Sequence, residues 1–225
     1  YVAVSAGQIV DATGRALTAP KERIQVYELI FAANFDSQNG RHTESLRKLQ
    51  QAEKTEPQSI TIQYLTALNY YRLRDYGRAR ERFQTVLQLD PKNSLATYYL
   101  GVCQLETGSL DAAIASFRQT LSLDPSNFVA AYNLGATYTR QKRADDALAA
   151  FLEATKILPE YAEAHAALGE LYLYQKRVDD AVRELEKAVA LNPALRRAHY
   201  QLGQAYTALG LSEKAQRELE LAKEP

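Results

Sequence analysis

Residues 94–127 read SLATYYLGVCQLETGSLDAAIASFRQTLSLDPSN, and residues 128–161 read FVAAYNLGATYTRQKRADDALAAFLEATKILPEY. The two stretches have the same length and agree at several positions. A leucine–glycine pair, an alanine, a phenylalanine and a proline stand at the same places in both. Two copies of one long pattern indicate a repeated structural unit and not a single globular core.

Prolines extend this pattern along the chain. They recur every thirty-four residues, at Pro57, Pro91, Pro125, Pro159 and Pro193. In this register the successive units begin at Val26, Ile60, Ser94, Phe128, Ala162 and Arg196. We therefore predict an N-terminal arm or leader over residues 1–25, followed by units over residues 26–59, 60–93, 94–127, 128–161, 162–195 and 196–225.

Each unit has the pattern of a helical hairpin. Large apolar and small residues recur at helical spacing in two blocks of about fourteen residues. The eighth position of the unit is always small, which lets two helices approach closely: Ala33, Ala67, Gly101, Gly135, Gly169 and Gly203. Glycines at positions 40, 108 and 210 fall where the chain must reverse between the two helices. The closing proline ends the second helix, because it cannot continue a helix and restricts the residue before it.

This combination of residues resembles the tetratricopeptide repeat family. The leucine–glycine pair, a tyrosine three residues after the glycine, the alanine and aromatic residue of the second block and the closing proline are all in the family's register. The resemblance covers residues 26–225 and implies an all-α, right-handed superhelical solenoid of six helix-turn-helix repeats. Repeat one departs from the pattern at Asp36 and Ser45. Repeat six ends in polar residues, which we interpret as its own polar cap; the alternative is that the array is cut there.

Composition excludes several classes of function. The 27 basic and 27 acidic residues balance, so net charge gives no reason to expect binding to nucleic acid. Charged residues interrupt every apolar stretch, so we predict no membrane insertion. The single cysteine excludes an internal disulfide framework but does not fix the compartment. The chain contains no methionine, even at residue 1, so cytoplasmic and processed, exported origins both stay open.

The first twenty residues differ from the repeats. They alternate loosely between apolar and small polar residues, with turn-forming residues at 11–14. An extended arm, a weak hairpin and the end of an upstream β domain are all compatible with this pattern. We expect Pro20 to introduce the first helix.

Signs of catalytic or metal chemistry are almost absent. The sequence has no glycine-rich phosphate loop, HExxH, CxxC or GxSxG motif, so we expect neither enzymatic activity nor a cofactor. His165 and His199 share the fourth position of successive repeats, which makes a shared metal conceivable. We interpret both as packing residues, and we interpret Cys103 as a small core residue.

The family resemblance points to a concave surface lined by the first helix of each repeat. Position five in successive repeats reads Ile30, Tyr64, Tyr98, Tyr132, Ala166 and Tyr200. Tyrosine gives contact area at low entropic cost, and a continuous apolar patch is typical of a binding site. We predict a peptide-binding groove lined by Tyr64, Leu68, Tyr71, Leu95, Tyr98, Val102, Leu105, Val129, Tyr132 and Asn133. The alternative is that the tyrosines are generic packing residues of this family.

One kind of partner is disfavoured. Family members that bind heat-shock chaperones hold a C-terminal carboxylate with lysine, asparagine and arginine at fixed positions of three consecutive repeats. From repeat one, the corresponding residues here are Ile30, Asn34, Leu65, Leu95 and Tyr99. Other starting repeats fit no better, so this carboxylate clamp is absent.

We therefore predict a scaffold that binds a protein or peptide segment in the groove. The first alternative is a self-assembling module, and a homo-oligomer, formed by exchange of the N-terminal arm or by end-to-end stacking. Repeat two carries an arginine run over residues 72–82, and repeats three and five are acidic, so opposite charges could favour such stacking. The second alternative is a regulatory segment of a larger enzyme.

Overall fold

The computed structural model describes residues 3–5, 8–10 and 21–223 of the chain. Two short strands, β1 (Ala3–Ser5) and β2 (Gln8–Val10), pair in antiparallel fashion with Val4 opposite Ile9. This pairing is compatible with the weak hairpin, one of the alternatives for the first residues. Residues 11–20, the rest of the segment before the first helix, lie outside the described residues.

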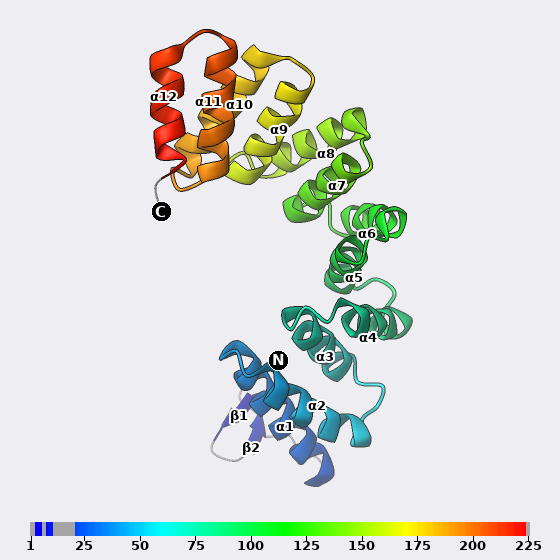
Figure 1. Cartoon of the computed structure of the whole chain (residues 1–225). Coiled ribbons are helices and arrows are strands. Elements are labelled where there is room, and N and C mark those ends of the chain that lie inside the picture. Colours follow the sequence, from blue (N-terminus) through cyan, green and yellow to red (C-terminus); the bar gives the residue numbers. More distant parts are fainter. Residues whose placement is uncertain (1–2, 6–7, 11–20, 224–225) are drawn as a thin grey trace. The chain divides into compact units, whose positions relative to one another are not determined.

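Helices make up almost all of the described chain and follow one another in consecutive pairs (Figure 1). The pairs are α1 (Lys21–Gln38) with α2 (His42–Thr55), α3 (Ile60–Arg72) with α4 (Tyr76–Leu89), α5 (Ser94–Glu106) with α6 (Leu110–Leu123), α7 (Phe128–Arg140) with α8 (Ala144–Ile157), α9 (Ala162–Tyr174) with α10 (Val178–Leu191), and α11 (Arg196–Ala208) with α12 (Ser212–Leu221). From repeat two onward, the first helix begins at the residue that the period marks as the start of the unit. Helix α1 begins at Lys21, directly after Pro20 and before the period's first residue, Val26.

The chain forms two compact units, Tyr1–Gly108 and Ser109–Pro225, which we call unit 1 and unit 2. The division falls between the two helices of repeat three. Unit 1 therefore contains α1 to α5, and unit 2 contains α6 to α12. Among the described helices, none combines the length and the apolar character needed to cross a bilayer.

The small residue at the eighth position of each repeat is explained by close helix packing. In unit 2, a Cβ added to Gly135 would lie 2.6 Å from the Phe151 ring, and one added to Gly169 would lie 2.4 Å from Leu185 Cγ. Such distances are shorter than van der Waals contact, so only glycine fits between these helices. In unit 1, Cys103 is completely buried with Phe83 in one apolar cluster, and burial raises the pKa of its thiol to about 12. The interpretation of Cys103 as a core residue is confirmed.

The reversal between the helices uses a left-handed residue in every repeat. Gly40, Gly108 and Gly210 have φ between 74° and 79°, as the sequence predicts for turn glycines. The other three repeats place Arg74, Lys142 and Lys176 at the same position, each with φ of 60°. A lysine or arginine gives no sequence signal for a left-handed conformation, so these three turns were not foreseen.

The two residues of repeat one that depart from the pattern, Asp36 and Ser45, make polar contacts instead of apolar ones. Asp36 is only 4% exposed, and its carboxylate accepts hydrogen bonds from Lys48 and Arg41, which hold its pKa below the usual value. Ser45 is completely buried and accepts a hydrogen bond from Asn69 of α3 at 3.0 Å. The two unusual residues are thus satisfied within repeat one and by the next repeat.

Two arginines of the run in repeat two make contacts within unit 1. Arg82 pairs with Glu53 and donates to Gln63, and Arg72 donates to the backbone carbonyl and hydroxyl of Ser37 at 3.0 Å. These contacts join repeats one and two. The two arginines therefore stabilise the stacking of neighbouring repeats.

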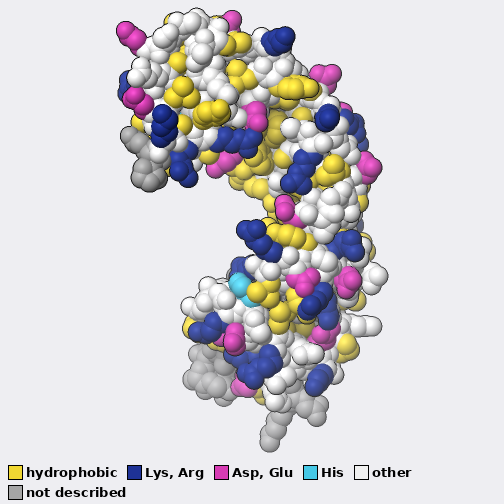
Figure 2. Space-filling view, in the orientation of Figure 1, with side chains coloured by type: hydrophobic (Ala, Val, Ile, Leu, Met, Phe, Trp, Pro, Cys, Tyr) yellow, Lys and Arg dark blue, Asp and Glu magenta, His cyan; other side chains and the backbone are white. Residues whose placement is uncertain are grey.

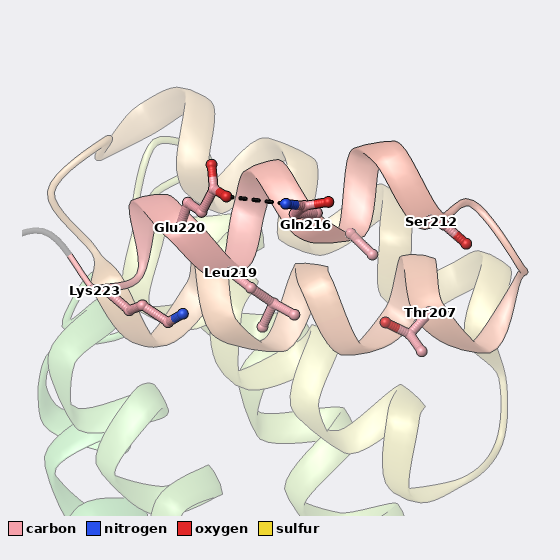
Figure 3. A pocket seen from close by; sticks show the side chains of 7 residues that line it. Thr207, Ser212, Gln216, Leu219, Glu220 and Lys223 are labelled. Atoms are coloured by element: carbon pink, nitrogen blue, oxygen red, sulfur yellow. Dashed lines mark hydrogen bonds between the residues drawn. The ribbon is translucent and has the colours of Figure 1, made fainter.

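Helix α12 presents a polar surface at the C-terminal end of unit 2 (Figure 3). Ser212, Gln216 and Lys223 are exposed there, beside a cleft of about 350 Å³, and Gln216 donates to Glu220 at 3.2 Å. The corresponding residues of repeat five, Val178, Val182 and Val189, are apolar and half-buried. This contrast supports the interpretation of α12 as a polar cap.

Candidate peptide-binding surface

In unit 1, the predicted groove residues lie on α3 and α5. The rings of Tyr64, Tyr71 and Tyr98 all meet Tyr99, with centroid distances of 6.5, 5.2 and 5.2 Å. Tyr99 also stacks on Phe83 at 5.4 Å. Tyr99 is not among the ten predicted groove residues, although the pair Tyr98–Tyr99 is visible in the sequence.

The exposure of these residues differs widely. Leu95 is 53% exposed, whereas Val102 and Leu105 are 9% and 7% exposed and offer little area to a ligand. The remaining side chains are half-buried, and burial raises the pKa of Tyr64 to about 12. The tyrosines of α3 therefore pack against the core and keep part of their surface exposed, which is compatible with both the packing and the binding interpretations.

In unit 2, the predicted residues Val129, Tyr132 and Asn133 lie on α7 and are half-buried. The Tyr132 ring packs against Phe151 of α8 at 5.6 Å and against Tyr161 at 5.4 Å. Burial raises the pKa of Tyr132. This ring forms part of the wall of a surface cavity, which the other two predicted residues of α7 do not line.

The cavity has a volume of about 780 Å³ and is formed mainly by α7, α9 and α11, the first helices of repeats four to six. Its apolar lining includes Tyr132, Ala166 and Tyr174, and the last of these is 79% exposed. The volume is within the range of small-ligand and side-chain binding sites. In the space-filling view, hydrophobic side chains gather over this part of unit 2, with acidic and basic side chains beside them (Figure 2). The groove predicted from the sequence lies in repeats two to four, so this cavity was not among the predicted features.

Charged side chains also line the cavity. Arg197 of α11 donates to Glu170 of α9 at 2.7 Å, so this ion pair joins repeats five and six. Glu163 lies two helical turns before Glu170 on α9 and is half-buried. Within the part of the chain that the structure describes, the side chain of Glu163 makes no hydrogen bond or ion pair. Gln201 is 6% exposed, and its Oε1 accepts no hydrogen bond from a described residue.

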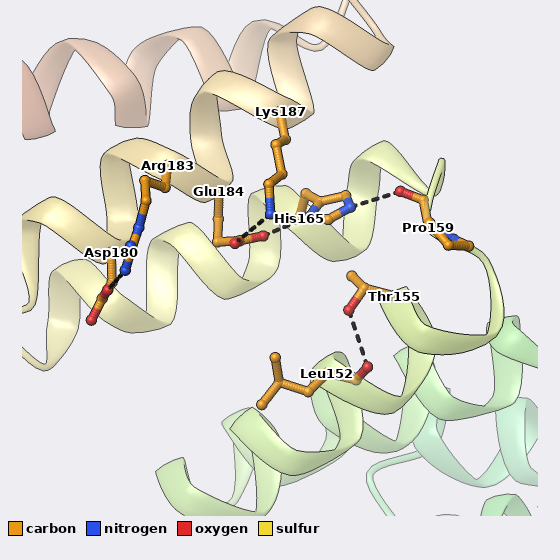
Figure 4. A network of polar contacts seen from close by, with 8 residues as sticks. All are labelled: Leu152, Thr155, Pro159, His165, Asp180, Arg183, Glu184 and Lys187. Carbon is orange, nitrogen blue, oxygen red and sulfur yellow. Dashed lines mark hydrogen bonds and ion pairs between the residues drawn. The ribbon is translucent and has the colours of Figure 1, made fainter.

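The two histidines of successive repeats lie away from this cavity, in separate polar networks. The Nδ1 atom of His165 is 2.6 Å from Glu184, and its Nε2 atom is 2.8 Å from the carbonyl of Pro159 (Figure 4). His199 makes the same two contacts with Glu218 and Pro193. Both rings are buried, which confirms their interpretation as packing residues. In the described part of the chain, no cluster of three or more His, Cys, Asp or Glu side chains is placed to hold a metal ion.

Family models match most of the array. Three that are described as tetratricopeptide repeat match residues 64–128, 108–171 and 197–224, and one described as TPR repeat matches residues 170–210. No curated protein matches the sequence.

Solved structures show the same fold. A crystal structure of MamA is 27% identical, has a TM-score of 0.64, and covers 69% of this chain and 91% of its own. YrrB, described as a TPR protein with an unusual peptide-binding site, is 21% identical with a TM-score of 0.66 and covers 80% of this chain and 97% of its own. The pilF protein of Pseudomonas aeruginosa is 14% identical with a TM-score of 0.77 and covers 88% of this chain and 90% of its own. These likenesses indicate an all-α solenoid of repeats.

Proposed function

The chain belongs to the tetratricopeptide repeat family, whose fold supports a protein–protein interaction scaffold, and we propose that it binds a peptide segment on the first helices of its repeats. The observation that carries this proposal is the cavity of about 780 Å³, because three consecutive first helices form it and predicted Tyr132 lines it. In unit 1, Leu95 of the first helix α5 is 53% exposed and offers a separate apolar surface to a ligand.

The proposed mechanism is binding to a preformed surface and not catalysis. Tyr64 and Tyr132 are held by ring contacts with Phe83 and Phe151 of the second helices, at 5.9 and 5.6 Å. Side chains that are already fixed lose little entropy when a ligand arrives, so most of the contact energy contributes to affinity. An extended segment would gain affinity from a few apolar anchors on such a surface.

A display library of random peptides, selected on the wild-type protein, tests this proposal. Leu95→Glu and Tyr174→Glu place a charge on the first-helix surface of unit 1 and of unit 2. Leu152→Glu is the matched control, because Leu152 is 45% exposed on the second helix α8. We expect the selected peptides to lose at least tenfold in affinity for one of the first-helix variants, about 1.4 kcal/mol, and to bind the control as they bind the wild type. The proposal fails if no peptide is enriched, or if Leu152→Glu weakens binding as much as the other two.

End-to-end self-assembly stays a second candidate with weaker support. Phe31 and Phe35 of α1 are 64% and 54% exposed, which gives unit 1 an apolar surface for another helix. Most of the exposed residues of α12 are polar or charged, however, so this surface is a poor match for an apolar one. We therefore rank peptide binding first.

A further inference from the structure

The cavity of unit 2 lies where one tyrosine is missing from the row at position five. Four of the six repeats carry tyrosine there, namely Tyr64, Tyr98, Tyr132 and Tyr200. Repeat five carries Ala166, which lines the cavity and is 8% exposed. The neighbouring residue Ala167 lines it too. Two successive alanines on α9 thus leave open a space at the position where repeat four carries Tyr132, whose ring packs against Phe151 and Tyr161.

The walls of this space suit an aromatic side chain. Tyr132 and Phe151 line one side, and Tyr174 stands at the end of α9. Aromatic rings contact each other favourably in edge-on and offset arrangements, with about 0.5–1.5 kcal/mol beyond the burial of area. A ring from a ligand would find such partners next to the alanines.

The charged residues that line the cavity determine which ligand side chain is favoured next to the aromatic ring. Among the three charged groups of α9 and α11 that line the cavity, Arg197 is paired with Glu170, which leaves the charge of Glu163 uncompensated. Glu163 is half-buried, so water screens its charge less than that of an exposed group. Arg140 and Lys142 line the cavity at the other end of α7, but both are exposed and their fields are screened more strongly.

We propose that this cavity binds a peptide segment in which an aromatic side chain enters the space beside Ala166 and an adjacent lysine or arginine pairs with Glu163. This inference rests on the proposed function and specifies its ligand. The ring replaces the missing tyrosine of the repeat pattern. The cation supplies the partner that Glu163 lacks among the described residues.

A tryptophan-containing peptide is the probe for this site. The protein has no tryptophan, so the peptide's indole emission reports binding without interference from the protein. The probe is a blocked peptide of serine and alanine that carries one tryptophan followed by two lysines. Two control peptides replace the tryptophan by alanine or the lysines by glutamates. We expect the first peptide to bind at least tenfold more tightly than either control.

Two variants test whether the peptide binds in the cavity. Ala166→Tyr restores the residue of the other repeats and fills the space, and we expect at least a tenfold loss of affinity. Ala190→Tyr is its control, because it adds the same ring to an exposed position of the second helix α10. Glu163→Gln removes the charge at almost constant size, and we expect it to abolish the preference for lysines over glutamates. Far-UV circular dichroism verifies that each variant keeps its helices.

The outcomes separate this inference from the proposed function. If Ala166→Tyr and Glu163→Gln bind the probe as the wild type does, or if the probe shows no preference over its controls, the inference is overturned. Display-selected peptides that still lose affinity for Leu95→Glu or Tyr174→Glu would then keep the proposed function intact. If no peptide binds in either experiment, both proposals fail.

Discussion

At the residue scale, His165 links three segments of unit 2. Its Nε2 atom donates to the carbonyl of Pro159, which closes repeat four, and its Nδ1 atom lies 2.6 Å from Glu184 of α10. Gln63 holds the same position in repeat two and donates to the carbonyl of Pro57 at 2.8 Å. A polar residue at position four therefore binds the carbonyl of the preceding closing proline in both units.

Substitution of His165 tests the pH dependence of this contact. The hydrogen bond to Glu184 raises the pKa of His165 above its ordinary value of 6.5, against the opposing effect of burial. The protonated ring therefore contributes stability that is fully present below about pH 6.5 and is lost as the pH rises through the folded pKa. We expect the wild type to be more stable to urea at about pH 6 than at about pH 8, and His165→Gln to reduce that difference.

The variant keeps the contact that matters for folding, because Gln63 shows that glutamine can bind a proline carbonyl at this position. His42 and His199 are unchanged, so any pH effect of these residues is common to both proteins. If the difference in stability between the two pH values is the same in His165→Gln as in the wild type, the contact between His165 and Glu184 is not its cause.

At the element scale, every helical hairpin turns through a left-handed residue, but only three of the six turns use glycine. A left-handed conformation costs an ordinary residue about 1–2 kcal/mol, because its Cβ crowds the following carbonyl. Glycine avoids this cost but loses about 0.4–1 kcal/mol more in chain entropy on folding. The difference favours glycine at these turns by about 0.5–1 kcal/mol.

Two substitutions measure this difference in unit 2. We expect Lys176→Gly to raise the free energy of unfolding by about 0.5–1 kcal/mol and Gly210→Ala to lower it by a similar amount. A Cβ added at Gly210 meets no atom within 4 Å, so the backbone alone accounts for the expected loss. Urea denaturation followed by circular dichroism measures both. A loss of stability in Lys176→Gly would mean that contacts of the lysine side chain outweigh the backbone strain.

At the scale of the whole molecule, the two ends of the array differ. Position ten of the first helix is buried in every repeat after the first, at Asn69, Cys103, Thr137, Leu171 and Ala205. In repeat two the reason is visible, because Asn69 contacts Ser45 and His42 of the preceding helix α2. In repeat one this position is Phe35, which is 54% exposed. The N-terminal end is therefore apolar, and the C-terminal end at α12 is polar.

We expect the polar residues at the C-terminal end, on α12 and directly after it, to prevent end-to-end association. The triple variant Ser212→Val, Gln216→Val and Lys223→Val copies the valines that repeat five carries at these positions. It exposes an apolar surface that the Phe31 and Phe35 side chains of a second copy can contact. We expect its self-association, measured as light-scattering mass against concentration, to be at least tenfold tighter than that of the wild type.

Two further substitutions identify the contact. Adding Phe31→Ser and Phe35→Ser to the triple variant should return its mass profile to that of the wild type. If association persists, the new surface pairs with itself and the N-terminal end takes no part in it.

The sequence by itself determined the repeat architecture. The proline period and the small eighth position predict the helical hairpins, because each hairpin packs mainly on its neighbours and one pattern is repeated along the chain. From Ile60 onward this periodicity even marks the first residue of each first helix. The ten predicted groove residues were placed on first helices, and all ten lie there.

Only the tertiary structure decided which of these residues are exposed on the surface. Burial depends on neighbours from other helices, so Val102 and Leu105 are almost covered while Leu95 is open, although all three lie on α5. The sequence shows that Ala166 interrupts the row of tyrosines at position five. It does not show the cavity that results, because residues of three helices form that cavity. A cavity is the absence of atoms between elements, and only the packed arrangement of those elements can reveal it.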